Sequence, residues 1–468
     1  MVMAPTGTGF GNVGGTASDK TMKFYVRRAI GGVGMIILET TTVDPSGLIS
    51  KTRLRIDEDR FIAGLSLLTQ KVKDQGARIA IQLSHRGGQA TKEEIGDTPV
   101  APSSVLAPGF REIPRALSVK EIHRLIHTFA EAARRAKEAG FDAVEVHGAH
   151  GLLICQFLSP AANFRKDEFG GDINGRTRFA AEIVRGIKRR VGEDFPVIFR
   201  ISAEEYIENG IKLGEAKIIA GLLQDAGVDL FHVSGGHYSN LLEWVIPPMM
   251  QPQRCLVPLA AGIKEAVTVP VMAVGGINDP LLAERILEEG KADLIAMSRA
   301  LIADPDFPRK AREKREKEIR KCIACNTCID RRVRLKTEVR CAINPEIGRD
   351  EEYEYKSAPV RKKVFIIGGG SGRNGSGPGG EDPGAPSYLV GGDRSVGRAA
   401  PFGGPSALQE GNLEYRRLLR VPIEEDRGDR SSSEESDPAD DRGAEARCDH
   451  CSDWGLGLQA RYPRGGSE

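Results

Sequence analysis

The sequence predicts an α/β protein built on a (β/α)8 TIM barrel, and three observations support this fold class. Short apolar segments of strand length recur over about 300 residues, the size of one such barrel. Amphipathic helical stretches separate them, as in a parallel sheet. Several segments are nearly continuous hydrophobic runs, which is typical of strands buried on both faces. We expect eight strands, at residues 2–4, 34–42, 78–84, 142–148, 196–202, 229–235, 270–276 and 293–299.

The helical stretch at residues 118–138 illustrates the periodicity between strands. Ser118 and Glu121 form the sequence signature of a capping box at its start. Apolar side chains then recur at helical spacing, at Ile122, Leu125, Ile126, Phe129, Ala132 and Ala136. An open doubly wound sheet is the alternative fold. It requires a short phosphate-binding turn after the first strand, whereas residues 7–15 form a longer loop.

A cysteine-rich segment follows the barrel. Residues 309–321 are strongly charged and predict a surface helix. Half of the eight cysteines then occur as C-x2-C-x2-C-x12-C, at Cys322, Cys325, Cys328 and Cys341. A tight triplet with a remote fourth cysteine favours a [4Fe–4S] cluster, and Asn344-Pro345 would turn the chain away from it. A structural zinc, which usually joins two distant C-x-x-C pairs, and unligated thiols are the alternatives.

The composition changes again near the C-terminus. Residues 362–370 combine two lysines, an apolar strand and three glycines, as at the start of a dinucleotide-binding βαβ unit. From residue 371 onward Gly, Arg, Asp, Ser and Pro dominate, and such a tail buries too little apolar surface to become ordered. We therefore expect an FMN-binding barrel at 1–310, a cluster segment at 311–357, a truncated dinucleotide-binding start at 358–370 and a disordered tail at 371–468.

Bulk properties exclude several functional classes. The chain has 66 basic and 65 acidic residues, so its net charge of +1 favours neither nucleic acid nor an anionic membrane. The cysteines lack the regular spacing of a secreted disulfide framework. No apolar run reaches membrane-spanning length, and we expect no signal peptide because the first residues lack a basic stretch followed by an apolar one. These features predict a cytoplasmic protein, and they are compatible with an oligomer.

Polar residues at the predicted strand ends are the candidate site, because such barrels place their chemistry there. His147 and His150 close the fourth strand and could donate hydrogen bonds to a substrate oxygen that gains charge. Metal binding and simple capping of the strand end are the alternatives. The amide of Gln82 suits the pyrimidine edge of a flavin, and Arg200 could place positive charge beside it. Both could equally be satisfied within the barrel mouth.

A phosphate site is predicted where the last two strands end. Gly275-Gly276 and Ser298-Arg299 combine backbone amides with one guanidinium group, the usual composition of a barrel phosphate site. Together with the cysteine segment that follows, this pattern indicates a phosphorylated redox cofactor, for which FMN is the natural candidate.

With these residues the chain resembles the iron–sulfur flavoenzyme branch of the old yellow enzyme superfamily, which includes 2,4-dienoyl-CoA reductase, trimethylamine dehydrogenase and bacterial NADH:flavin oxidoreductases. The similarity covers about residues 1–370. It rests on the cysteine segment and on Met3-Ala4-Pro5, Gln82-Leu83-Ser84-His85, His147-Gly148-Ala149-His150-Gly151, Gln156-Phe157-Leu158-Ser159-Pro160, Asn163, Arg165, Asp167, Gly170-Gly171, Arg176, Arg178 and Ser298-Arg299.

The resemblance implies specific roles. A [4Fe–4S] cluster is expected on Cys322, Cys325, Cys328 and Cys341, and a substrate carbonyl on His147 and His150. Hydride would pass from flavin N5 to an activated alkene. Contacts to FMN are implied at Ala4, Pro5, Gln82, Arg200, Gly275, Gly276, Ser298 and Arg299.

The chain departs from the family pattern at several positions. Leu152 replaces a tyrosine that serves as proton donor in many relatives, so His237, Tyr238 or water is expected to supply the proton. Thr6 replaces a common methionine, and Gly88 a common arginine. The sequence also begins inside the first predicted strand, and a misplaced start codon is our expectation.

Relatives of this kind continue into FAD- and NAD(P)H-binding domains, and we expect this chain to lack them. Read one nucleotide forward, residues 371–377 can be encoded as Pro-Ala-Gly-Met-Glu-Ala-Ala and residues 394–399 as Asp-Arg-Leu-Gly-Gly-Gln, both family motifs. We therefore hypothesise a frameshift near Gly370, with a native disordered tail as the alternative. On this hypothesis Cys448 and Cys451 are accidents of the wrong frame. The nucleotide sequence tests it.

The predicted function is an FMN- and [4Fe–4S]-dependent oxidoreductase that reduces an enoate or enoyl-CoA type substrate. Electrons would come from NAD(P)H, through FAD as in the intact relatives, or from an electron-donor protein. One alternative is an amine dehydrogenase of the trimethylamine dehydrogenase type, although only Tyr238 and Trp244 are candidates for its aromatic substrate bowl. A non-catalytic barrel with structural zinc is another alternative.

Overall fold

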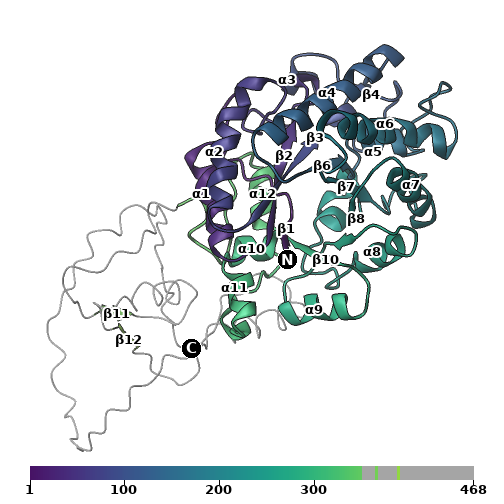
Figure 1. Cartoon of the computed structure of the whole chain (residues 1–468). Helices are drawn as coiled ribbons and strands as arrows, with labels where there is room; N and C mark the ends of the chain where they lie inside the picture. Colours follow the sequence, from purple (N-terminus) through teal and green to yellow (C-terminus); the bar gives the residue numbers. More distant parts are fainter. Residues whose placement is uncertain (350–363, 367–386, 390–468) are drawn as a thin grey trace, which may run out of the picture. The chain divides into compact units, whose positions relative to one another are not determined.

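A computed structural model of the chain describes residues 1–349, 364–366 and 387–389. Its centre is a closed barrel of eight parallel strands, in the order β1-β10-β9-β8-β7-β6-β3-β2 (Figure 1). The predicted (β/α)8 fold is therefore confirmed, and each of the eight predicted segments contains one barrel strand. These strands are β1 (Val2–Met3), β2 (Met35–Thr42), β3 (Arg78–Ser84), β6 (Ala143–Gly148), β7 (Val197–Ser202), β8 (Leu230–Ser234), β9 (Val271–Ala273) and β10 (Leu294–Met297).

The last two barrel strands are shorter than the sequence predicted. Strand β9 stops at Ala273 because Gly275 and Gly276 take positive φ values of 105° and 66°, which an extended strand does not allow. Strand β10 stops at Met297, and Arg299 begins helix α10 instead of ending the strand. The predicted phosphate-binding residues therefore lie beyond the strands, Gly275 and Gly276 on a turn and Ser298 and Arg299 at the start of α10.

Helices form a ring around the barrel (Figure 1). The capping box predicted at Ser118 and Glu121 is present, and the predicted apolar face of α4 is buried. The longer helices are α1 (Asp19–Ile30), α2 (Ile62–Lys73), α4 (Val119–Glu138), α6 (Ile173–Val191), α7 (Leu213–Asp225), α8 (Val257–Lys264) and α9 (Pro280–Glu288). The shorter ones are α3 (Lys92–Ile95), α5 (Leu153–Leu158), α10 (Arg299–Ala303), α11 (Phe307–Arg312) and α12 (Thr327–Val333).

The barrel interior changes character along its axis. Small and medium apolar side chains fill its lower layers, at Val2, Ala4, Ile37, Ala80, Ala143, Ile198, Met272 and Ala296. Because side chains alternate along each strand, the residues two positions further on point the same way. On β3, β6 and β7 these residues are polar: Gln82 lies two positions after Ala80, Glu145 after Ala143 and Arg200 after Ile198. The polar end is the carboxyl end of the strands.

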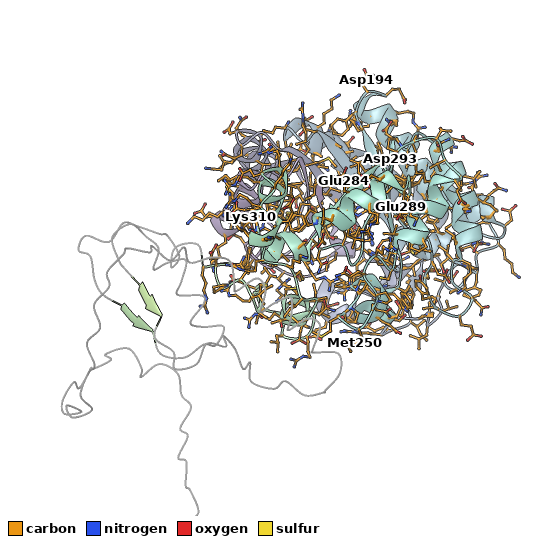
Figure 2. The ribbon with its side chains drawn as sticks, turned by 90° about the horizontal axis from the view of Figure 1, so that it is seen from below. Asp194, Met250, Glu284, Glu289, Asp293 and Lys310 are labelled. Carbon is orange, nitrogen blue, oxygen red and sulfur yellow. The ribbon has the colours of Figure 1, made fainter. Side chains whose placement is uncertain are left out.

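Three aspartates tie neighbouring strands together at the opposite end of the barrel. Each precedes one strand and accepts a hydrogen bond from a backbone N–H of the preceding barrel strand. Asp142 accepts from Ile79 (2.8 Å), Asp229 from Val197 (2.7 Å) and Asp293 from Val271 (2.9 Å). Each aspartate also binds a lysine at 2.7–3.1 Å, namely Lys73, Lys188 and Lys264. Figure 2 labels Asp293 close to Glu284 and Glu289, near helix α9.

The segment after the barrel is less regular than predicted. Instead of one charged helix over residues 309–321, helix α11 ends at Arg312 and only a 3-10 turn, Glu316–Glu318, follows. Lys314 between them has a φ of 58°, which breaks the helix. No helix in residues 1–349 is long and apolar enough to cross a membrane.

Two pairs of short strands lie outside the barrel sheet. Strands β4 (Val100–Ala101) and β5 (Arg115–Ala116) pair in parallel, as do β11 (Val364–Ile366) and β12 (Ser387–Leu389). Strand β11 falls within the predicted dinucleotide-binding start. The glycine turn predicted at 368–370 and nearly all of the predicted tail lie outside the described residues. The domain boundaries and the frameshift hypothesis stay predictions.

Candidate active site

Polar side chains from adjacent strands meet at the carboxyl end of the barrel. Gln82 on β3 pairs in register with Glu145 on β6, and His147 on β6 pairs with Arg200 on β7. Arg200 in turn pairs with His232 on β8. All five side chains are buried. The structure thus brings together five residues. The sequence predicted three of them, Gln82, His147 and Arg200, and the structure adds Glu145 and His232.

The amide of Gln82 is held on both sides. Thr40 donates its hydroxyl to Gln82 Oε1 at 2.5 Å, and Gln82 Nε2 donates to Glu145 Oε1 at 2.7 Å. Because an amide offers two N–H groups and two lone pairs, one donor and one acceptor remain for a ligand. That remaining pair fits the pyrimidine edge of a flavin, which needs both.

The second oxygen of Glu145 binds a histidine. Glu145 Oε2 lies 2.7 Å from Nδ1 of His232, and neither side chain is exposed. Sequence reasoning missed this pair. A signal existed, because Glu145 and His232 are each a polar residue inside an apolar strand, in Val-Glu-Val-His and Leu-Phe-His-Val. Their pairing was not visible, because the two strands are far apart in sequence.

Arg200 is a buried cation that lacks a hydrogen-bond acceptor at one nitrogen. Its Nε atom has no partner among the described residues, and burial lowers the pKa of the guanidinium group. Glu145 influences that charge from a distance, but its oxygens bind Gln82 and His232. An unsatisfied buried cation is costly, so a ligand with acceptor atoms would stabilise this site. The residues present therefore fit FMN, whose ring carries such acceptors.

His147 and His150 lie side by side at the mouth, with ring centroids 5.1 Å apart. Burial lowers the pKa of both rings well below the usual value, with a further contribution from the charge of Arg200. The backbone N–H of Ala149 donates to Nδ1 of His147 at 3.3 Å. A neutral ring that accepts at Nδ1 carries its proton on Nε2. His147 therefore presents an N–H donor from Nε2.

The candidate proton donors lie next to this pair. The backbone of His237 forms a β-bridge with His150, and the ring of Tyr238 lies 6.3 Å from that of His150. His237 accepts at Nδ1 from the backbone N–H of Ser239 (3.1 Å), and burial lowers its pKa to about 4. Tyr238 is 39% exposed and open to solvent. Leu152 is buried, without a titratable group, just before helix α5.

The predicted phosphate-binding residues gather around the ends of β1, β9 and β10. The hydroxyls of Ser298 and Thr6 lie 2.6 Å apart and connect the end of β10 with the end of β1. Thr6 also donates its hydroxyl to the carbonyl of Ala4, which is buried and precedes Pro5. A Cβ atom on Gly276 would lie 3.0 Å from the backbone nitrogen of Arg254, and one on Gly275 would meet Leu256. These glycines leave backbone amides accessible at close range.

Arg299 connects this region with the cysteine segment. Its Nη1 donates to the carbonyl of Pro247 at 2.7 Å and to Oδ1 of Asn326 at 2.5 Å. Asn326 has a left-handed φ of 56° and donates its own amide to the carbonyl of Ile246. The segment between Cys325 and Cys328 is thus attached to the barrel mouth.

The four predicted cysteine ligands influence each other electrostatically. Burial and the neighbouring thiols raise the pKa of Cys322 to about 11 and that of Cys328 to about 12, and burial raises the pKa of Cys341. Buried thiols of this kind ionise together only when a metal replaces their protons. Their donor chemistry therefore fits an iron–sulfur cluster. Within residues 1–349, however, no group of three or more His, Cys, Asp or Glu side chains has the geometry of a metal site.

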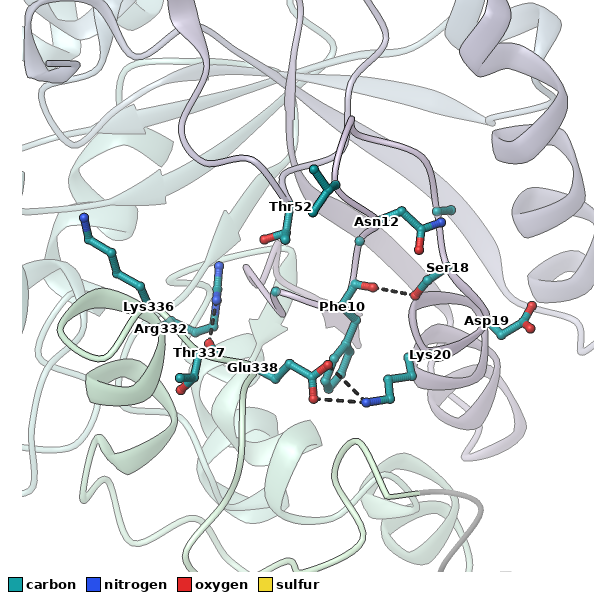
Figure 3. Close-up of a pocket in the computed structure, with 14 residues that line it drawn as sticks. Phe10, Asn12, Ser18, Asp19, Lys20, Thr52, Arg332, Lys336, Thr337 and Glu338 are labelled. Atoms are coloured by element: carbon teal, nitrogen blue, oxygen red, sulfur yellow. Dashed lines mark hydrogen bonds and ion pairs between the residues drawn. The ribbon is translucent and has the colours of Figure 1, made fainter. Parts of the chain in front are cut away.

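A groove of about 850 Å³ separates residues 9–20 from residues 332–338 (Figure 3). An ion pair between Lys20 and Glu338 (3.1 Å) crosses it, and Arg332 donates to the carbonyl of Thr337 (2.5 Å). The predicted catalytic and cofactor residues do not line this groove.

Comparisons with known proteins identify the family to which this chain is similar. The profile of the NADH:flavin oxidoreductase / NADH oxidase family matches residues 1–318. An NADH oxidase of Thermoanaerobacter brockii is 47% identical over 79% of this chain and 57% of its own length. A cinnamate reductase of Clostridium sporogenes is 36% identical over 79% of this chain and 59% of its own length. The chain spans somewhat more than half the length of these curated relatives.

Solved structures show the same similarity. A 2-naphthoyl-CoA reductase in complex with 2-naphthoyl-CoA superposes with a TM-score of 0.83 at 27% identity, over 90% of this chain and 66% of that one. Histamine dehydrogenase from Rhizobium sp. 4-9 superposes with a TM-score of 0.79 at 28% identity, over 90% of this chain and 61% of that one.

Proposed function

Because the chain belongs to the NADH:flavin oxidoreductase / NADH oxidase family, we propose that it is an FMN-dependent oxidoreductase that reduces the C=C bond of an α,β-unsaturated carbonyl compound. The observation that carries this proposal is the neutral pair His147 and His150 beside the unsatisfied Nε of Arg200. Similarity to a cinnamate reductase and a 2-naphthoyl-CoA reductase supports an enoate or an enoyl-CoA type thioester as the substrate.

The two histidines would bind the substrate carbonyl oxygen. His147 carries a proton on Nε2 and donates it as a hydrogen bond, which strengthens as negative charge develops on the oxygen. Their lowered pKa values keep both rings neutral near pH 7, so they act as hydrogen-bond donors instead of fixed cations. Rings held in place before the reaction begins require little reorganisation as it proceeds.

The remaining residues would hold the cofactor. Gln82 and Arg200 would bind the flavin ring system, with Ala4 and Pro5 beside it, and its phosphate would bind at Gly275, Gly276, Ser298 and Arg299. Bound FMN supplies the hydride that the alkene accepts. The proton for the other alkene carbon would come from Tyr238, His237 or water, because the aliphatic side chain of Leu152 carries no acidic proton.

We propose further that Cys322, Cys325, Cys328 and Cys341 hold a [4Fe–4S] cluster, which supplies single electrons to the barrel site. The attachment of Asn326 to Arg299 supports this arrangement, because it fixes the cysteine segment at the barrel mouth. Electrons would originate from NAD(P)H, delivered through FAD-binding domains like those of intact relatives or through a separate donor protein.

Anaerobic purification followed by an absorbance spectrum tests the proposal. We expect flavin bands with a broad cluster absorbance, released FMN on acid treatment, and reoxidation of the photoreduced flavin by cinnamate or an enoyl-CoA. A colourless protein that contains zinc would contradict it and favour the non-catalytic barrel. Full reduction without reoxidation by any enoate or enoyl thioester would contradict the substrate class.

Amine oxidation is the second candidate function. Tyr206 and Trp244 stack with ring centroids 3.9 Å apart, and Trp244 lies against Gly236 next to His237. Aromatic faces of this kind attract organic cations, and the chain is similar to a histamine dehydrogenase. Reduction of the oxidised flavin by histamine or trimethylamine would favour this function over alkene reduction.

A further inference from the structure

We propose that Glu145 and His232 form a buried positioning pair, which fixes the amide of Gln82 and sets the charge beneath the flavin. The pair would thereby control both the affinity for FMN and the reduction potential of the bound flavin. This inference rests on the proposed function, because it concerns the same cofactor site. Both residues act through others, so neither is expected to react with substrate.

The first argument is a continuous chain of hydrogen bonds. It runs from the Thr40 hydroxyl to Gln82, from Gln82 to Glu145 (2.7 Å), and from Glu145 to His232 (2.7 Å). A carboxylate only accepts, so Gln82 must turn its Nε2 toward Glu145, and His232 must carry a proton on Nδ1. The chain permits one orientation of the Gln82 amide. Without Glu145 the amide could turn over and exchange its free donor for an acceptor.

The second argument concerns charge. Glu145 acts electrostatically on both Arg200 and His232, yet it forms no ion pair within 4 Å with Arg200 in the described structure. Arg200 therefore keeps its own donors for a ligand, while its positive charge is partly offset from a distance. When the negative charge of Glu145 is removed, the positive charge of Arg200 is no longer partly compensated. Negative charge added to a flavin held by Gln82 and Arg200 would then be more stable, and the reduction potential of that flavin would rise.

The third argument is that such a pair is a poor way to stabilise a fold. Replacing a fully buried carboxylate and its hydrogen-bond partner with apolar side chains of similar size is often neutral or stabilising, because the desolvation of the charge is avoided. Neither Glu145 nor His232 has any exposed side-chain surface. Moreover, Nε2 of His232 has no partner in the described structure. Fold stability therefore does not explain the pair, and a role in ligand binding does.

The test uses the full chain, stripped of FMN and titrated again under anaerobic conditions. Flavin fluorescence gives the Kd, and dye equilibration gives the midpoint potential. Glu145→Gln keeps the size and removes the charge, whereas His232→Leu removes the hydrogen bond to Glu145. Gln82→Leu reports on the cofactor site itself. His127→Asn, on the exposed face of α4, is the matched control.

We expect Glu145→Gln to raise the Kd about tenfold, equivalent to one good hydrogen bond to a charged group, and to shift the potential to more positive values. His232→Leu should raise the Kd, and it should also lower the melting temperature, because the buried carboxylate of Glu145 loses a hydrogen-bond donor. The control should match wild type in each measurement. A Glu145→Gln protein with unchanged potential, or a His232→Leu protein with unchanged Kd, overturns the inference. If Gln82→Leu also binds FMN normally, the proposed cofactor site itself is wrong.

Discussion

Nε2 of His150 lies 2.8 Å from the hydroxyl of Ser234, which is the last residue of strand β8. The backbone N–H of His150 donates to the Ser202 hydroxyl at the end of strand β7 (2.9 Å). His150 needs this support, because its φ of 63° is unusual for a residue other than glycine. Two strand ends therefore determine where the ring of His150 points.

The histidine pair gives the first prediction. His147→Ala combined with His150→Ala should leave FMN content unchanged and slow reoxidation of the reduced flavin by an enoate at least 100-fold, because the carbonyl oxygen loses its hydrogen-bond donors. Anaerobic stopped-flow absorbance measures this rate. His147→Asn, which keeps an N–H donor, should retain part of the activity. Unchanged rates in the double variant would remove the proposed role of both rings.

The cysteine segment gives the second prediction. Cys328→Ser should abolish acid-labile sulfide and bound iron, because three thiolates do not complete the cluster. Cys255→Ser is the control, since Cys255 is a free cysteine that lies just before helix α8 and outside the cysteine segment. Metal analysis of both anaerobically purified variants makes the comparison. Equal iron and sulfide in the two proteins would contradict a cluster on these four cysteines.

Buried histidines give the third prediction, on stability and pH. Burial lowers the pKa of His85 and of His237 to about 4. In the unfolded chain each titrates near 6.5, so between these values the unfolded state binds more protons than the folded state. The free energy of unfolding should therefore fall as the pH drops from about 6.5 to 4, by roughly 1 kcal/mol per pH unit for each such histidine.

Urea denaturation at a series of pH values measures this slope. The control variant is His127→Asn, which replaces an exposed histidine on α4. His85→Asn, which keeps a polar side chain of similar reach, should reduce the slope between pH 6.5 and 4. A free energy of unfolding that stays constant over this range would show that the buried rings take up protons in the folded state.

The ties at the amino end of the barrel give the fourth prediction. Asp229→Ala removes the acceptor for the Val197 N–H and the partner of Lys188, whose side chain is only 5% exposed. The variant should lose about 2 kcal/mol of unfolding free energy, because a buried ammonium group and a buried N–H lose an acceptor. Asp225→Ala, at the exposed end of α7, should cost little. Chemical denaturation of both proteins gives the comparison.

The barrel could be predicted from the sequence because every strand is an apolar run bounded by helical periodicity. The ends of β9 and β10 could not be placed, since Gly275 and Ser298 directly follow apolar residues and the sequence does not show where the backbone turns. Likewise, the charge of residues 309–321 suggested one helix, but charge alone does not show that Lys314 takes a left-handed conformation.

Those residues of the candidate site could be predicted whose polar side chains stand near the end of their own strand. Gln82, His147 and Arg200 were found because each has polar chemistry at the end of its own strand. Glu145 and His232 were missed because their roles depend on partners 63 and 87 residues away in sequence. Ser202 and Ser234 were missed for the same reason. Contacts between strands follow from the barrel register, which composition and spacing do not specify.

The hydrogen bond from Arg299 to Asn326 has a practical consequence for cutting this protein into parts. A fragment that stops after the eighth strand–helix unit would contain the whole barrel. It would nevertheless leave the guanidinium group of Arg299 without its amide acceptor and the carbonyl of Ile246 without the amide that donates to it. The smallest autonomous unit worth expressing should therefore extend beyond Asn326.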